Sequence, residues 1–113
     1  RISKCGGLVA SIKRAREALS AGLEVQLGCQ VGESSLLSAA QLVLAACVAP
    51  VRYFEGCFGQ HLLRDDPSMP VLQFGYGGRP PKTEARPGLG IQVDERSLAR
   101  WVKRSATIGS PTV

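Results

Sequence analysis

The chain has 113 residues, 44% of them hydrophobic, and a net charge of +5 from 14 Lys and Arg against 9 Asp and Glu, which suits one soluble globular domain. No apolar run reaches the roughly 18 residues that a membrane span needs, and no signal segment is visible, so we expect a cytoplasmic protein. The basic residues fall on the polar sides of two predicted helices and few aromatics accompany them, which argues against a nucleic-acid partner; they are Lys13, Arg14 and Arg16, then Arg100, Lys103 and Arg104.

Residues 1–56 alternate between strand-like and helix-like patterns with short links. Apolar residues recur at helical spacing from Leu8 to Ala21 and again, almost all round, from Leu36 to Val48, so the second helix must be covered on more than one side. The strand-like runs are Arg1–Lys4, Leu23–Cys29 and Val51–Phe54.

This order predicts an α/β fold with a parallel sheet and right-handed crossovers. Three parallel strands leave unpaired edges and an uncovered face, so the missing strands must come from residues absent here or from another chain. Because strand-like Arg1–Lys4 has no cap or leader before it, we expect the chain to be a piece of a longer protein.

Residues 57–93 carry most of the prolines and many glycines, which predicts a looped return segment. Short strands are expected at Val71–Phe74 and Ile91–Val93. Asp94 should cap a last helix from Glu95 to about Arg104, before a frayed tail over residues 105–113. The glycine clusters at 75–78 and 88–90 do not join a strand to a helix in the order that a phosphate loop requires, so they indicate turns.

Reactive groups of parallel barrels stand at the carboxyl ends of strands, and this rule selects Lys4, the stretch from Cys29 to Glu33, and Glu55. Lys4 is a candidate acid/base group or a surface lysine, and Glu55 is a candidate proton donor or a solvated loop carboxylate. Glu33 is a candidate site residue or a carboxylate favoured at a helix start.

Four cysteines, Cys5, Cys29, Cys47 and Cys57, form no CxxC pair and meet one histidine, His61, so we expect buried or half-buried thiols in a reducing compartment and no metal site. His61 has no nucleophile in an elbow motif, which argues against a catalytic triad.

Several motifs resemble the enolase superfamily, in the branch of muconate-lactonizing enzymes, dipeptide epimerases and o-succinylbenzoate synthases. They are Ile2-Ser3-Lys4-Cys5-Gly6-Gly7, the stretch from Gly28 to Ala40, and Pro87-Gly88-Leu89-Gly90-Ile91 with Asp94-Glu95 and Leu98-Ala99-Arg100. The resemblance implies that residues 1–56 form strands six to eight of a (β/α)7β TIM-like barrel. Residues 57–104 would return to a capping domain that, with the first barrel strands, is missing here.

The resemblance also implies roles for single residues. Lys4 matches the sixth-strand acid/base lysine, Glu55 matches the eighth-strand proton donor after a one-residue shift, and Cys29 and Glu33 fall among the substrate-binding positions. Dipeptide epimerases carry Asp-x-Asp near the end of strand eight, which Tyr53–Cys57 lacks, so that activity is in doubt.

The implied chemistry is abstraction of a proton next to the carboxylate of a small substrate, as in a cycloisomerase, a racemase or epimerase, or a dehydratase. Mg²⁺ or Mn²⁺ would hold the enolate charge, with ligands upstream of Arg1. We expect the isolated chain to be inactive and the full-length protein to be a homo-oligomer. A non-catalytic, truncated barrel module with a role in assembly is the alternative, which the upstream reading frame would distinguish.

Overall fold

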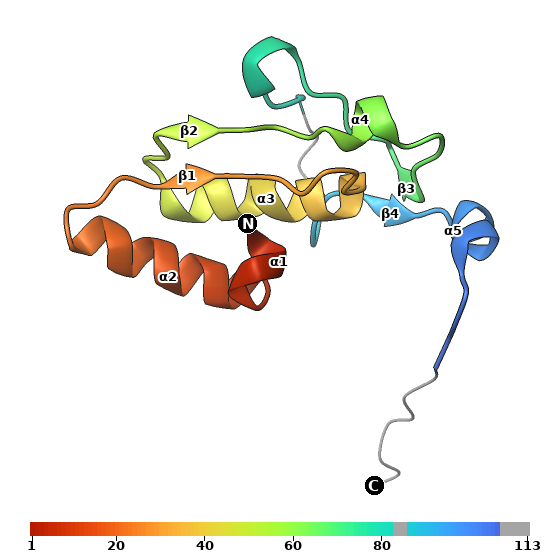
Figure 1. Cartoon of the computed structure of the whole chain (residues 1–113), viewed down its shortest axis with the longest axis horizontal. Coiled ribbons are helices and arrows are strands. Elements are labelled where there is room, and N and C mark those ends of the chain that lie inside the picture. Colours follow the sequence, from red (N-terminus) through yellow and green to blue (C-terminus); the bar gives the residue numbers. More distant parts are fainter. Residues whose placement is uncertain (83–85, 107–113) are drawn as a thin grey trace, which may run out of the picture.

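The computed structural model describes residues 1–82 and 86–106, and Figure 1 labels its elements. Among these residues no helix has the length and apolar character needed to cross a membrane. In chain order the elements are α1 (Ile2–Cys5), α2 (Leu8–Ser20), β1 (Gln26–Leu27), α3 (Ser35–Val48), β2 (Tyr53–Phe54), α4 (Gly59–Leu62), β3 (Ser68–Met69), the 3-10 turn η1 (Tyr76–Gly78), β4 (Gln92–Val93) and α5 (Glu95–Trp101).

The strands β1 and β2 form a parallel pair, with Gln26 opposite Tyr53 and Leu27 opposite Phe54. Backbone hydrogen bonds extend the pairing on both sides, because Arg52 N donates to Val25 O at 2.9 Å and Glu55 N donates to Leu27 O at 3.0 Å. Helix α3 makes the crossover between the strands. The predicted α/β class and the parallel order of these two strands are confirmed, although both strands are shorter than the sequence suggested.

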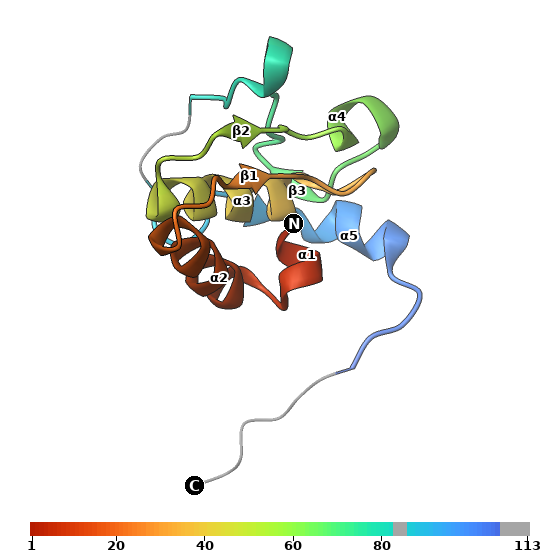
Figure 2. The same ribbon diagram turned by 60° about the vertical axis from the view of Figure 1, so that its left-hand side comes forward.

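Helix α3 lies against β1 and β2 in both ribbon views and is covered on two sides (Figures 1 and 2). One apolar cluster joins it to α1, α2 and β1 through Ile2, Ala15, Leu27, Ala40, Leu44 and Val48. A second cluster joins it to the return segment through Ala39, Cys57, Leu72 and Phe74. Phe54 packs against both clusters and stacks on Phe74 with ring centroids 5.9 Å apart. The prediction that this helix is covered on more than one side is therefore confirmed.

The predicted strand at Arg1–Lys4 is wrong, because residues 2–5 form helix α1. The amides of Lys4 and Cys5 both donate to Arg1 O, at 3.0 and 3.2 Å, and Gly7 N donates to Ile2 O. Gly6 ends the turn with a φ of 85°, in the left-handed region that glycine adopts at little cost. These backbone donors and acceptors are paired within the segment, so the segment needs no neighbouring strand. The Ile2 side chain packs in the first apolar cluster.

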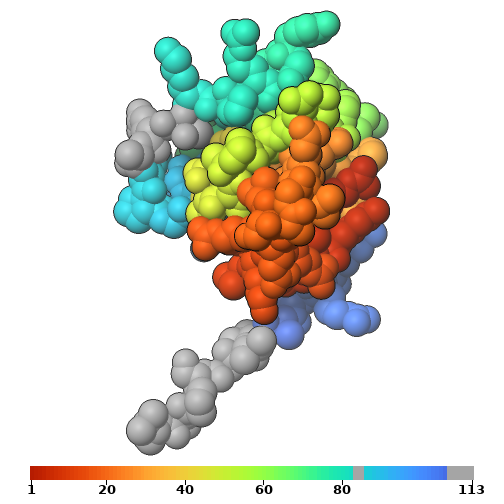
Figure 3. Space-filling model, turned by 90° about the vertical axis from the view of Figure 1, so that its left-hand side faces the viewer, coloured from red at the N-terminus to blue at the C-terminus, as the bar shows by residue number. Residues whose placement is uncertain are grey.

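The predicted strand at Val71–Phe74 is also wrong, because side chains take the place of a neighbouring strand. Leu72 N donates to Ser35 Oγ at 2.9 Å, and Phe74 N donates to Gln60 Oε1 at 2.6 Å. The antiparallel pair forms instead between β3 and β4, with Ser68 opposite Val93 and Met69 opposite Gln92. In Figure 3 the teal return segment lies directly against the yellow-green segment that contains β2.

Two further expectations need correction. Cys47 is exposed, because the two packed sides of α3 face the apolar clusters and Cys47 is in neither cluster. Cys5 is half-buried, and Cys29 and Cys57 are buried, as expected. The last helix ends at Trp101, three residues before Arg104. Most of the predicted tail, residues 107–113, lies outside the described residues.

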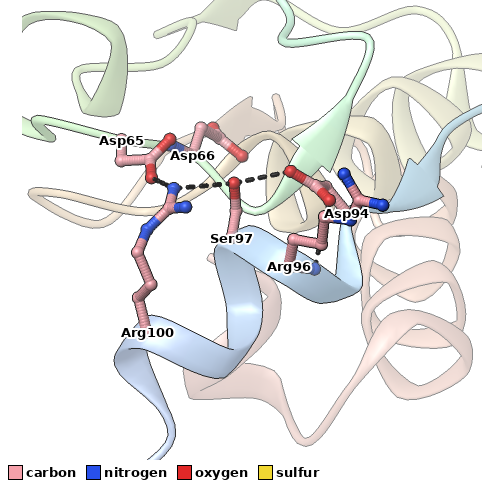
Figure 4. A network of polar contacts seen from close by, with 6 residues as sticks. All are labelled: Asp65, Asp66, Asp94, Arg96, Ser97 and Arg100. Carbon is pink, nitrogen blue, oxygen red and sulfur yellow. Dashed lines mark hydrogen bonds and ion pairs between the residues drawn. The ribbon is translucent and has the colours of Figure 1, made fainter.

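Asp94 caps α5, as the sequence predicts. Its carboxylate accepts hydrogen bonds from Arg96 N at 3.2 Å and from Ser97 Oγ at 2.6 Å, and the Ser97 hydroxyl is the main cause that lowers the pKa of Asp94. Arg100 continues this network, since it donates to Ser97 Oγ and forms an ion pair with Asp65 (Figure 4). The cap thus joins the start of α5 to the loop before β3.

Because the pKa of Asp94 is lower in the folded state, its contribution to stability is present above the unfolded value, near 3.8, and is lost as the pH falls through the folded value. An Asp94→Asn variant keeps an acceptor oxygen but does not titrate. We expect urea unfolding to show a steeper acid loss of stability in the wild type than in this variant below about pH 5. Equal slopes would contradict the assigned cap.

Candidate active site

Glu55 and Cys29 meet at the carboxyl ends of the two parallel strands. Each follows its strand by one or two residues, and the parallel register brings both to the same edge. Glu55 Oε2 accepts the Cys29 amide hydrogen at 2.7 Å. A Cβ at Gly28 would lie 3.0 Å from this oxygen and 3.4 Å from Arg1 Cγ and Nε, so the glycine leaves the space that the carboxylate and Arg1 fill.

The Cys29 side chain is buried, with a relative exposure of 2%. Burial is the main cause that raises the pKa of this thiol, and the carboxylates of Glu33 and Glu55 raise it further. The thiol therefore remains protonated at neutral pH, and a protonated thiol is a poor nucleophile. Cys29 contributes to the site through its backbone amide, which orients Glu55.

Glu33 is also buried, with a relative exposure of 7%, and its carboxylate accepts three hydrogen bonds. Oε2 accepts Gln30 N at 2.7 Å, and Oε1 accepts Gln41 Nε2 at 2.5 Å and Ser38 Oγ at 3.4 Å. Burial raises the pKa of this carboxyl group, against these bonds. In this arrangement Glu33 fixes the loop after β1 onto α3, and its predicted role in substrate binding stays a prediction.

The start of α3 is capped by a residue that the sequence did not indicate. Ser34 occupies the cap position but makes no side-chain capping bond. Asp66 Oδ2 instead accepts Ser35 N at 2.7 Å and Ser35 Oγ at 2.8 Å. No local pattern could have shown this, because Asp66 lies 31 residues farther along the chain.

Among the described residues, no hydrogen bond or ion pair joins the Lys4 side chain to Glu55, and the predicted catalytic role of Lys4 stays a prediction. Lys4 is exposed on α1, and its side chain forms no hydrogen bond or ion pair within residues 1–82 and 86–106. Its neighbour Ser3 does reach the loop after β1, since Gln30 Nε2 donates to Ser3 Oγ at 2.9 Å. The structure therefore groups Glu55, Cys29 and Glu33 around the ends of the strands and, in the part of the chain that it describes, shows no polar side-chain contact between Lys4 and this group.

A cleft of about 530 Å³ opens beside Glu55. Its walls are the start of α4 and the glycine-rich turn around η1, and its lining residues are Glu55, Cys57, Phe58, Gln60, His61, Phe74 and Gly75 to Gly78. From the sequence, the glycines indicate only a turn and His61 lacks a catalytic partner, so this cleft is not predicted. The one signal in the sequence is the cluster of glycines at 75–78, downstream of the strand-end carboxylate Glu55.

Gln60 holds the two walls of the cleft together. Its Oε1 accepts Phe74 N at 2.6 Å while its Nε2 donates to Phe74 O at 3.0 Å. Because the Phe74 amide fixes which amide atom is the oxygen, Nε2 must also be the donor to His61 Nε2, which lies 3.0 Å away. Neutral His61 therefore carries its proton on Nδ1.

A family model described as Enolase C-terminal domain-like matches residues 1–97. The chain belongs to this family. The match confirms the resemblance to the enolase superfamily and to its branch of mandelate racemases and muconate-lactonizing enzymes. No curated protein and no solved structure matches the chain significantly.

Enolase superfamily members generally use Mg²⁺. Within residues 1–82 and 86–106, no three His, Cys, Asp or Glu side chains are arranged so that they could hold a metal ion. The carboxylates nearest the strand ends already accept protein hydrogen bonds, Glu55 from Cys29 and Glu33 from Gln30 and Gln41. The described part of this enolase-like domain does not by itself fit a magnesium site.

Replacing Gln60 by Ala removes both hydrogen bonds to the buried Phe74 backbone. We expect a loss of about 1–3 kcal/mol in the free energy of unfolding, because a donor and an acceptor lose their partners. Urea unfolding followed by circular dichroism measures this. Gln73→Ala, an exposed glutamine of the same segment, is the control and should change stability by less than about 0.5 kcal/mol. Equal effects of the two variants would contradict the assigned role.

For Glu33 we expect stability to change with pH in the opposite direction from that expected for Asp94. A carboxyl group whose folded pKa is raised contributes stability that is fully present below the unfolded value, near 4.5, and is lost as the pH rises through the folded value. The stability of the wild type relative to Glu33→Gln should therefore fall as the pH rises. Urea midpoints measured across this range test the trend, with Glu17→Gln on the exposed face of α2 as the control. Parallel curves for Glu33→Gln and the wild type would refute it.

Proposed function

We propose that this chain is the C-terminal part of a cytoplasmic isomerase or lyase that abstracts a proton next to the carboxylate of a small substrate. The observation that carries the proposal is the position of Glu55. This carboxyl group stands where a parallel strand ends, next to the end of the neighbouring strand and on the wall of a cleft, in a domain of the enolase superfamily. Reactive groups of parallel barrels occupy this position.

The packing of the strand pair supports a larger barrel. Leu27 and Phe54 turn toward α3 and the apolar clusters, whereas Gln26 and Tyr53 on the other face are exposed, Tyr53 to 59%. Parallel sheets normally bury both faces. Further barrel strands and a capping domain, supplied by another part of the protein, would cover the exposed face.

Glu55 acts as the proton donor in this proposal. The Cys29 amide holds Oε2, so one oxygen orients the carboxyl group and the other can exchange a proton with the substrate. Lys4 acts as the acid/base group or as the cation beside the developing enolate. The role of Lys4 rests on the resemblance of the Ile2–Gly7 motif, since α1 leaves this lysine exposed.

The metal, Mg²⁺ or Mn²⁺, would lower the energy of the enolate charge when bound to carboxylates outside the described residues. Cys29 and Glu33 shape the substrate-binding region at the strand ends. The Cys29 amide orients Glu55, and Glu33 fixes the loop at 30–33. The assembled enzyme is a homo-oligomer in this proposal.

Removal of the Lys4 charge tests the catalytic role in the assembled barrel protein. Lys4→Ala should lower kcat about a hundredfold, roughly 3 kcal/mol of barrier, and weaken substrate binding much less. Lys4→Arg should not restore the rate, because a guanidinium group stays protonated at working pH. The assay follows deuterium uptake from solvent next to the carboxylate in a panel of small carboxylic acids. Lys13→Ala, at an exposed lysine of α2, should retain the wild-type rate.

Two outcomes would overturn the assignments. Rates like the wild type in both Lys4 variants would remove Lys4 from the site. An assembled protein that exchanges no substrate proton with any acid in the panel, with or without added Mg²⁺, would instead support the non-catalytic barrel module. Circular dichroism of each variant confirms that a lost rate does not reflect lost folding.

A further inference from the structure

We propose that Gly78, in the glycine-rich turn Gly75–Arg79, is a positioning residue that fixes Glu55 in its productive place. The importance of this positioning for catalysis rests on the function proposed above. The coupling between the turn and the Glu55 position can be tested without any substrate. The turn is closed by two hydrogen bonds, from Gly75 N to Arg79 O at 2.9 Å and from Gly78 N to Gly75 O at 3.1 Å.

The turn touches the end of β2 backbone to backbone. A Cβ on Gly78 would lie 2.6 Å from Phe54 O and 3.1 Å from the carbonyl atoms of Glu55. A Cβ on Gly56 would lie 2.9 Å from Gly78 Cα. Since real Cβ atoms do not approach other atoms so closely, both glycines are required for this contact. The contact fixes the backbone of residues 54–56 from one side.

The segments around the Gly75–Arg79 turn hold it in place. Gln60 binds both backbone groups of Phe74, the residue just before the turn, and the Phe74 ring stacks on Phe54. Helix α4, which carries Gln60, begins at Gly59, where a Cβ would lie 1.9 Å from Glu33 O. The turn, α4 and the Glu33 loop therefore form one packed unit around the strand end.

The position of Glu55 tolerates little movement. Its carboxylate reaches the Cys29 amide at 2.7 Å over the space left by Gly28. A shift of about 1 Å in the strand end would break this hydrogen bond, and reacting groups need placement within about 0.5 Å. The turn at Gly78 therefore decides whether Glu55 stays oriented toward its partner.

The test compares Gly78→Ala with Gly77→Ala. Both glycines have a positive φ, 75° and 67°, so both substitutions strain the backbone alike. Only the Cβ at position 78 strikes the strand end, because at position 77 it would meet nothing within 4 Å. The readout is hydrogen exchange of the Cys29 amide by NMR, with the Arg52 amide, which bonds to Val25 O in the strand ladder, as the internal reference.

We expect Cys29 to exchange about tenfold faster or more in Gly78→Ala, with Arg52 changed by less than about twofold. Gly77→Ala should leave the ratio of the two rates near that of the wild type. If Gly78→Ala does not fold, Gln60→Glu replaces it in the test, because this variant keeps the acceptor for Phe74 N and loses the donor to Phe74 O. The exchange rate of the Cys29 amide should again rise relative to that of Arg52.

Equal Cys29 exchange in the two alanine variants would overturn the positioning role, and so would an unchanged ratio in Gln60→Glu. The proposed function fails by a different measurement. If Cys29 exchange responds as expected but Glu55→Gln turns over substrate at the wild-type rate in the assembled protein, the turn positions a residue that is not catalytic. The two failures are therefore distinguishable.

Discussion

Packing of α3 on two sides is the constraint on which the rest of the structure depends. The helix is apolar almost all round, so a single partner layer could not remove its surface from water. Leu44 and Val48 pack toward α1, α2 and β1, and Ala39 packs toward the return segment. Phe54 bridges the two clusters, so the parallel strand pair and the return segment are held against the same helix. The strand ends, and the groups that follow them, are placed by this helix.

Buried and half-buried polar groups then fix the loops that the apolar clusters leave undefined. Asp66, Gln60 and Ser35 supply hydrogen bonds to backbone groups of α3 and of the segment 72–74. Glu33 does the same for the Gln30 amide while it binds Gln41 and Ser38. An unpaired donor or acceptor in these positions costs free energy, and long loops offer few neighbouring strands to satisfy it. The loops around the cleft are thereby ordered by side chains instead of by a sheet.

The candidate active site follows from these two layers of packing. Glu55 comes from the end of β2, its partner amide from the residues after β1, and the opposite wall from the turn around η1. The chain belongs to the enolase superfamily, and the function proposed above puts proton transfer next to a carboxylate at this edge, with Glu55 as the donor. The tight backbone contact at Gly78 connects the cleft wall to the strand end that carries Glu55.

The sequence by itself determined the α/β class, the helices α2 and α3, the parallel order of β1 and β2, the cap at Asp94, and the family. These features depend on periodicity, on single capping residues and on motifs, all of which are local. Tertiary structure decided that residues 2–5 turn into a helix, that 71–74 form no strand, that Cys47 is exposed, and that Glu55 binds the Cys29 amide. Each of these outcomes depends on which distant group satisfies a hydrogen bond or covers an apolar face, and residue spacing along one chain does not contain that information.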